Sequence, residues 1–181
     1  HLSSSLMKII KPKVAHIIPS MNYGGVEVAI QKSLKDLNKN FDYKIFTVKN
    51  VGKPKIGQKN YIYLIKYIIS QKWVPDAIIT SLWWSHILGL ILKIFGFKWY
   101  AFYHSSSSTH LINYLITRIS SMISDCCFAD SQETKRFIAK FTKKEIKIIP
   151  YKFSAKKAKN ISNPLKRFYD FIFVGRIIKD K

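Results

Sequence analysis

Two adjacent glycines, Gly24 and Gly25, stand between an apolar run and a helical pattern whose first turn holds Glu27. Backbone N–H groups at a helix start have no partner within the helix, and they bind phosphate or sugar oxygens where no side chain shields them. The pair belongs neither to a G-x-G-x-x-G dinucleotide fingerprint nor to a P-loop. Two interpretations therefore stay open: an anion or sugar site at this helix start, and a tight turn that binds nothing.

A histidine, His104, leaves the apolar run 98–103 and is followed by four serines, of which Ser105 is the first. An imidazole can bind a hydroxyl group or transfer a proton near neutral pH, so this position suits a hydroxyl-rich ligand. The structural alternative is that His104 packs in the core while Ser108 caps the next helix. His16, inside a predicted strand, is expected to be a core residue whose ring nitrogens have partners.

Two further groups follow apolar runs. Ser131, after Asp130, can bind a ligand or simply cap the helix that follows it. Arg176 and Lys181 follow the run 170–175, and two fixed cations suit the charge that develops on a diphosphate leaving group. Without other context the two cations are a basic surface strip. No Cys/His spacing typical of a metal site occurs, so no metal is predicted.

The charge of the chain predicts an anionic partner. Among 181 residues, 31 are Lys or Arg and 10 are Asp or Glu, which gives a net charge of +21. Such a surface attracts nucleic acid, acidic lipid or phosphorylated ligands. Nucleic acid is disfavoured, because no nucleic-acid-binding motif occurs and the lysines are spread along the chain. The alternative is that the Lys- and Ile-rich composition is a bias without a binding role.

Apolar runs and helical patterns alternate along the chain, and the elements they predict would position these residues. This alternation predicts an α/β fold: a doubly wound, mostly parallel Rossmann-like sheet with helices on both faces. Ligands bind such sheets at the carboxyl ends of the strands, where the glycine pair and His104 lie. The predicted strands are 14–19, 43–48, 77–80, 98–103, 126–129 and 146–150, with helices over 26–37, 61–71, 84–95, 109–124 and after Ser131.

Residues 82–103 are the most apolar stretch, and two interpretations compete for it. A membrane span needs about 20 apolar residues. His86, Lys93 and two glycines interrupt this stretch, which favours a buried helix followed by a buried strand. Cys126 and Cys127 are adjacent and are expected to be reduced residues packed in a strand. The helix predicted over 109–124 has one apolar face, formed by Ile112, Leu115, Ile116, Ile119 and Ile123.

Taken in order, these motifs resemble the family-4 glycosyltransferases of the two-domain, twin-Rossmann type. The matching segments are NYGGVE, PDAIIT, WYAFYHS, DCCFADSQETKRF, IKIIP and VGRIIKDK. Each segment alone has low to moderate specificity, and their order along residues 8–181 carries the resemblance. IPYKF departs from the family's usual IPNG. The chain also ends at Lys181, before the position of the family's glutamate pair.

The resemblance implies a division of the chain into parts. Residues 1–6 precede Met7 and look like a remnant of cloning. Residues 7–153 would form the N-terminal Rossmann-like, acceptor-side domain, and 154–168 would be a linker. Residues 169–181 would be the first strand of a second domain, which in the family holds most of the nucleotide.

The resemblance also implies an activity: transfer of a hexosyl or related sugar, with retention, from a nucleotide-diphosphate sugar to a glycan or lipid-linked acceptor in surface polysaccharide synthesis. No cofactor or metal is implied, because the nucleotide sugar is a co-substrate. His104 would be the catalytic residue and would bond the transferring sugar. The 181 residues alone are expected to turn over no donor. The implied substrate-binding residues are Gly24, Gly25, Glu27, Ser105, Ser131, Arg176 and Lys181.

The predicted partners are the nucleotide sugar, the acceptor and an anionic membrane surface; the predicted location is the cytoplasm, peripheral to the inner face of the membrane. Two alternatives come from other classes: a basic nucleic-acid-binding module, and a Rossmann-like binding protein without catalysis. A steep salt dependence of nucleic-acid binding would support the first of these. A membrane-facing surface is expected from cations among aromatics, namely Lys66, Lys72, Lys93, Lys98 and Arg118 with Tyr63, Tyr67, Trp73, Trp83, Trp84 and Trp99.

Overall fold

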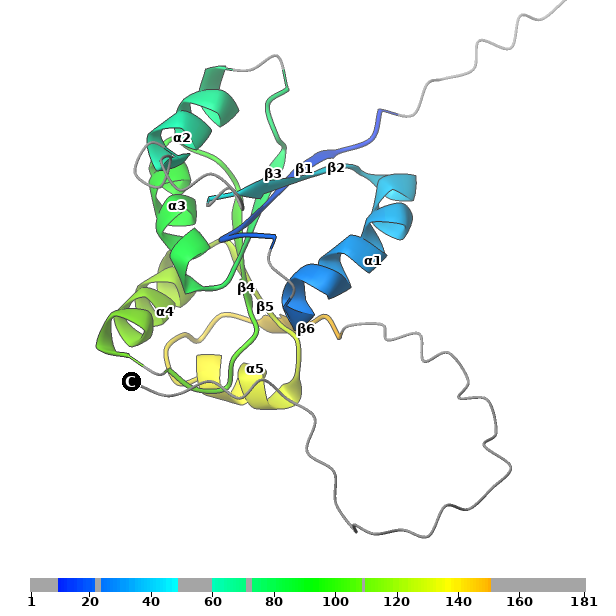
Figure 1. The fold of residues 1–181 in the computed structure, drawn as a ribbon. Coiled ribbons are helices and arrows are strands. Elements are labelled where there is room, and N and C mark those ends of the chain that lie inside the picture. The colour runs from blue at the N-terminus through cyan, green and yellow to red at the C-terminus, as the bar shows by residue number, and fades with distance from the viewer. Residues whose placement is uncertain (1–9, 22–23, 49–59, 71–72, 109, 151–181) are drawn as a thin grey trace, which may run out of the picture.

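A single parallel β-sheet forms the centre of the computed structural model (Figure 1). The structure describes residues 10–21, 24–48, 60–70, 73–108 and 110–150. The six strands follow the order β2-β1-β3-β4-β5-β6, and every neighbouring pair is parallel. The strands are β1 (Lys13–Ile18), β2 (Asp42–Thr47), β3 (Ala77–Ser81), β4 (Trp99–Tyr103), β5 (Cys126–Ala129) and β6 (Ile146–Ile148).

Helices connect consecutive strands and cover both faces of the sheet. Figure 1 shows α1 on one face, and α2, α3 and α4 on the other. The predicted α/β, Rossmann-like fold with a parallel sheet is therefore confirmed. The helices are α1 (Gly25–Asn40), α2 (Asn60–Ser70), α3 (Trp83–Ile94), α4 (Leu111–Ile123) and α5 (Gln132–Ile138).

The strand order changes direction between β1 and β3. The chain passes from β1 to β2 on one side, and then returns across β1 to β3 and continues outward to β6. In doubly wound sheets a crevice opens at this switch point, at the carboxyl ends of the strands, because the two connections leave in opposite directions. The start of α1 follows β1, and Ser81 ends β3. Both lie at this edge of the sheet.

The main core lies between α3 and the sheet face that this helix covers. Ala15, Ile17, Ala101 and Cys127 have no exposed surface and pack with residues of α2, α3 and α5. The stretch 82–103 is α3 followed by β4, as predicted. Within the part of the chain that the structure describes, no helix has the length and apolar character needed to cross a bilayer. The two cysteines are free, and both belong to β5.

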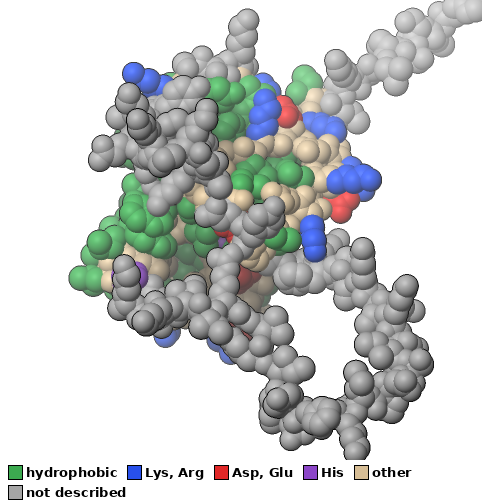
Figure 2. Space-filling view, in the orientation of Figure 1, with side chains coloured by type: hydrophobic (Ala, Val, Ile, Leu, Met, Phe, Trp, Pro, Cys, Tyr) green, Lys and Arg blue, Asp and Glu red, His purple; other side chains and the backbone are tan. Residues whose placement is uncertain are grey.

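Helix α4 buries its polar face and exposes its apolar face, whereas most amphipathic helices bury their apolar face. Its buried residues are Thr117, Ser120 and Ser121. The hydroxyl groups of Tyr103 and Ser120 lie 2.8 Å apart and share a hydrogen bond, which ties the polar side of α4 to β4. Most large apolar residues of α4 are exposed, whereas Ile116 of the predicted apolar face is half-buried. Figure 2 shows hydrophobic surface over this part of the molecule.

The predicted cationic and aromatic surface is not one surface in the structure. Trp99 is wholly buried, because its ring packs beneath Gly89 of α3 and its indole N–H donates to Thr80. Trp73 lies against β2, where Lys44 sits 4.3 Å from its ring centroid. Trp83 and Trp84 stack on each other at the start of α3. The side chains of Tyr63 and Lys72 lie outside the described residues.

Candidate functional site

The start of α1 is open at one glycine and covered at the other. A Cβ on Gly24 would lie 2.2 Å from the Glu27 carboxylate, whereas a Cβ on Gly25 would meet nothing within 4 Å. Gly24 has φ −119°, which any residue adopts, so the turn alone does not require glycine there. The carboxylate of Glu27 thus complements the positive end of the helix. Gly25 offers the open space in which a ligand oxygen could approach the backbone.

His104 is held between two neighbouring strands. Its Nε2 atom lies 3.0 Å from Ser81 Oγ at the end of β3, and its Nδ1 atom faces Asp130 Oδ2 at 3.6 Å, just after β5. The imidazole also packs on Phe102, with ring centroids 4.2 Å apart. Only 2% of its side chain is exposed. Both ring nitrogens therefore have partners, and the ring orientation is fixed.

The contact with Ser81 extends across the sheet to β1 and β2. Ser81 Oγ also lies 2.7 Å from His16 Nε2, and His16 Nδ1 lies 2.5 Å from Tyr43 Oη. All five side chains lie on the sheet face that carries α1, as the strand register and the alternation of side chains require. We call this set, Tyr43, His16, Ser81, His104 and Asp130, the strand-end network.

The proton positions in the strand-end network follow from the charges of its members. Burial, and secondarily the nearby His104, lowers the pKa of His16 to about 3, so His16 is neutral at pH 7. Burial raises the pKa of Tyr43, which stays protonated, so its hydroxyl can donate to His16 Nδ1. In the His104 tautomer that carries its proton on Nδ1, that proton faces the Asp130 carboxylate, which can only accept. In this arrangement Ser81 donates to His104 Nε2 and accepts from His16 Nε2.

Asp130 ends the network as a carboxylate. Its pKa is lowered, chiefly by hydrogen bonding with His104, with a further contribution from Thr134. The Thr134 hydroxyl donates to Asp130 Oδ1 at 2.8 Å. Ser131 caps α5, because its Oγ accepts from the Thr134 backbone N–H at 3.2 Å. The capping alternative given for Ser131 is thus confirmed, and its hydroxyl supports the helix that fixes Asp130.

A small cavity of about 60 Å³ adjoins His104 at the carboxyl ends of β3 and β4. Leu82 lies at its edge with φ 69°, a backbone conformation that non-glycine residues adopt only under strain. Ser105 also lines the cavity, and its hydroxyl donates to the Ser107 carbonyl. The other lining residues are Trp83, His86, Tyr103, Ser107, Asn113, Thr117 and Phe137.

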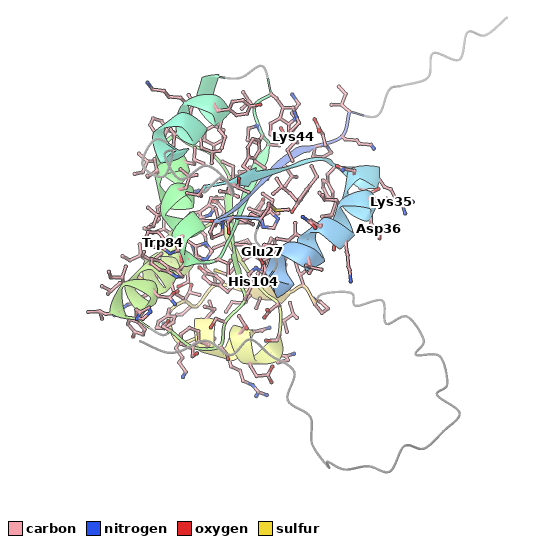
Figure 3. All side chains as sticks on the ribbon, in the orientation of Figure 1. Glu27, Lys35, Asp36, Lys44, Trp84 and His104 are labelled. Carbon is pink, nitrogen blue, oxygen red and sulfur yellow. The ribbon has the colours of Figure 1, made fainter. Side chains whose placement is uncertain are left out.

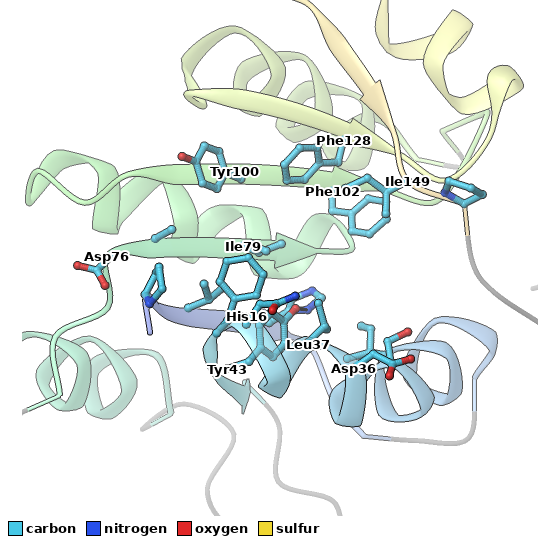
Figure 4. Close-up of a pocket in the computed structure, with 18 residues that line it drawn as sticks. His16, Asp36, Leu37, Tyr43, Asp76, Ile79, Tyr100, Phe102, Phe128 and Ile149 are labelled. Atoms are coloured by element: carbon cyan, nitrogen blue, oxygen red, sulfur yellow. Dashed lines mark hydrogen bonds between the residues drawn. The ribbon is translucent and has the colours of Figure 1, made fainter. Parts of the chain in front are cut away.

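A larger groove, of about 590 Å³, lies on the face that carries α1 (Figure 4). Aromatic and aliphatic side chains of β3, β4 and β5 form its floor, and α1 forms one wall. His16 and Tyr43 line it as well. The strand-end network therefore runs from this groove to His104 at the carboxyl edge of the sheet.

The structure brings some of the predicted site residues together and separates others. His104 and Ser105 share the small cavity. The start of α1 lies at the same edge of the sheet, and Figure 3 shows Glu27 and His104 there, but neither Glu27 nor the glycine pair lines that cavity. Arg176 and Lys181 lie outside the described residues, as do residues 1–6, 154–168 and 169–181.

The alternatives considered for His104 and His16 have different outcomes. His16 is a core residue with both ring nitrogens partnered, as predicted. His104 does pack, but Ser108 does not cap α4: its hydroxyl is buried without a partner in the described structure, and His110 is the N-cap residue. The contacts of Ser81 with His104 and His16, and the role of Tyr43, were not predicted from the sequence. Both residues alternate onto the same face of the sheet, and that alternation can be read from the sequence. It predicts their contacts only when the order of the strands is known.

The network holds one oriented imidazole beside a small cavity of mixed lining. A ligand hydroxyl group that takes the place of Ser81 at His104 Nε2 could bind there or exchange a proton with the ring. The described residues contain no cluster of three or more His, Cys, Asp or Glu that could hold a metal ion. A scan of the sequence against protein-family models finds no match, and a search of curated proteins finds none either.

Proposed function

We propose that this chain is the acceptor-side domain of an enzyme that transfers a sugar from a nucleotide-diphosphate sugar to a glycan or lipid-linked acceptor. The observation that carries the proposal is the placement of His104, which Ser81 and Asp130 hold at the carboxyl edge of a parallel sheet. This edge is where doubly wound sheets bind nucleotide and sugar ligands. The motif order described above supports the same assignment.

In this proposal a single hydroxyl group of the transferring sugar replaces Ser81 as the partner of His104 Nε2. The adjoining cavity of about 60 Å³ has room for about two water molecules, and hence for a hydroxyl group but not for a sugar ring. Ser81 and Asp130 are positioning residues, because they fix the imidazole and act through it. The sugar ring itself would lie outside, between this cavity and the start of α1.

The open space at Gly25 supports a second contact in the same proposal. A diphosphate or acceptor oxygen can approach the first N–H groups of α1 there, while Glu27 covers Gly24. In the reaction, the bond between the anomeric carbon of the sugar and the diphosphate oxygen breaks, and the acceptor oxygen forms a new bond to that carbon. The proton of the acceptor hydroxyl leaves with the nucleoside diphosphate. Arg176 and Lys181 would stabilise the charge left on the diphosphate.

Chemical-shift mapping of the backbone amides tests the proposed site. With UDP-glucose and GDP-mannose as probes, we expect the largest shifts at Gly25, His104 and Ser105, and none at Lys147 on the far strand. A single-stranded oligonucleotide is the control for nonspecific attraction to the positive charge. Shifts that the oligonucleotide reproduces, or no shift at these positions at millimolar probe, would refute the proposal.

A turnover assay tests the catalytic part separately. We expect no release of nucleoside diphosphate by these 181 residues alone, because the proposed reaction needs groups from a second domain. Turnover by the chain alone would contradict the two-domain form of the proposal. In that case the chemical-shift mapping would still show whether a nucleotide sugar binds at this edge of the sheet.

A further inference from the structure

Six large apolar side chains of α4 face outward, and we call them the α4 face. Leu111 is 73% exposed and Ile112 is 62% exposed. The side of α4 that packs on α3 and α5 instead carries serine and threonine. Contiguous apolar surface of this kind marks a contact with a partner or a membrane. The α4 face consists of Leu111, Ile112, Leu115, Ile119, Met122 and Ile123.

A groove of about 440 Å³ borders this face, between α4 and α5. Two cations line it, Arg118 from α4 and Lys140 after α5. Among the described residues neither cation forms an ion pair with a carboxylate. Its walls are aromatic: the ring of Phe141 meets those of Tyr114 and Phe137 edge-on, with centroids 5.1 and 5.2 Å apart. The groove thus combines two positive charges with aromatic walls.

The charge of the molecule distinguishes between two possible occupants of this surface. A second copy of the chain would bring together two molecules of net charge +21, which repel each other. An anionic bilayer attracts the same charge, and each Lys or Arg near its surface adds to the attraction. Helix α4 carries no acidic residue. Apolar side chains bordered by cations also match the order of acyl chains and phosphates at a bilayer surface.

We propose that the α4 face inserts into the surface of an anionic bilayer and that the groove beside it binds one lipid phosphate between Arg118 and Lys140. The apolar residues enter the outer part of the acyl region, and the two cations stay at the depth of the headgroups. Helix α4 begins just after the loop that follows His104, so docking brings the candidate site close to the membrane. The docking does not depend on the proposed function; delivery of a lipid-linked acceptor to His104 does.

Vesicle sedimentation tests the docking directly. We expect the chain to bind vesicles of equal parts phosphatidylglycerol and phosphatidylcholine at least about tenfold more tightly than phosphatidylcholine vesicles. The double variant Leu115→Ser/Ile119→Ser should lose at least about tenfold in affinity, because two apolar side chains no longer enter the bilayer. The matched control is Ile69→Ser on α2, since Ile69 is 42% exposed and Ile119 is 43% exposed. The control should bind as the unchanged chain does.

The groove is tested with a second pair of substitutions. Arg118→Gln/Lys140→Gln should remove about tenfold of the preference for anionic vesicles. Far-ultraviolet circular dichroism and a thermal melt establish that each variant is folded. Equal binding to both vesicle types would overturn the proposal. So would α4-face and groove variants that bind vesicles as the unchanged chain does. Concentration-dependent dimers that α4 substitutions disrupt, or inorganic phosphate that saturates the groove without vesicle binding, would overturn it as well.

Discussion

The strand-end network and the α4 face depart from the usual division of polar and apolar side chains in opposite ways. The network buries two histidines, a serine and a tyrosine on the sheet face that carries α1, and Ser81 has no exposed surface. The α4 face exposes large apolar residues to solvent, while α4 turns serines and a threonine inward. The His104 end of the network and the start of α4 both belong to the connection that leaves β4.

The network and the α4 face differ in what offsets the free-energy cost of their unusual burial or exposure. Each buried polar atom of the network finds a partner within the sheet, from Tyr43 to Asp130, so the network is stable without a ligand. The cost of exposing apolar surface to water cannot be offset by hydrogen bonds within the protein, because it is relieved only when that surface is removed from water. The network therefore fixes a site from within, and the α4 face indicates a partner outside the molecule.

The largest effect on stability should follow from deleting the imidazole of His16. His16→Ala leaves Tyr43 and Ser81 buried without their partner, and we expect the free energy of unfolding to fall by about 2 to 4 kcal/mol. Urea denaturation measures the change. The comparison variant Ile119→Ala, on the exposed α4 face, should stay within about 0.5 kcal/mol. Equal losses for the two variants would show that the network does not stabilise the fold.

Stability should also depend on pH in a defined direction. His16 and His86 have folded pKa values of about 3, lowered by burial, against 6.5 in the unfolded chain. Between these values the unfolded state binds more protons, so stability is complete above pH 6.5 and declines as the pH falls. The limiting slope is about 1.4 kcal/mol per pH unit for each histidine. Urea midpoints at pH 7, 6 and 5 would measure it.

A flat profile over that range would mean that the two rings are not buried as neutral groups. His16→Gln is the control, because its amide can keep hydrogen bonds with the neighbouring hydroxyls but does not titrate. It should remove about half of the slope. The lowered pKa of Asp130 has the same sign, since its contribution to stability is lost only as the pH falls below the usual carboxyl range.

A smaller effect should follow from removing the cap of α5. Ser131→Ala deletes the oxygen that accepts from Thr134 N–H, and we expect a loss of about 1 kcal/mol in the free energy of unfolding. The predicted binding role for Ser131 gives a different result: weaker nucleotide-sugar shifts at His104 with unchanged stability. Thermal melts and chemical-shift titrations of the same variant separate the two roles.

The smallest effect on stability is expected at the open glycine. Gly25→Ala adds a methyl group that meets no atom within 4 Å, so stability should change by less than about 0.5 kcal/mol. The methyl group should nevertheless shield the helix start and reduce nucleotide-sugar shifts there. A destabilisation above that range would mean that Gly25 serves the fold and not a ligand.

The sequence predicted the elements of the sheet because its strands are short apolar runs followed by helical patterns, as VAHIIP and KWYAFY are. It could not predict the strand-end network. Ser81 and His16 meet only because β3 lies beside β1, and that order is a tertiary property. Periodicity likewise found the apolar face of α4 but not its direction, which depends on the bond of Ser120 to Tyr103 on another element.

The central claim is that the strand ends hold one oriented imidazole where a ligand can reach it. A proton–nitrogen correlation spectrum of the histidine rings, recorded with and without a nucleotide sugar, tests this most directly. We predict that His104 carries its proton on Nδ1, that Ser81→Ala disturbs its Nε2 signal, and that the ligand shifts the same signal. A proton fixed on Nε2, or a ring whose signals respond neither to Ser81→Ala nor to the ligand, would show that the strand ends do not hold such an imidazole.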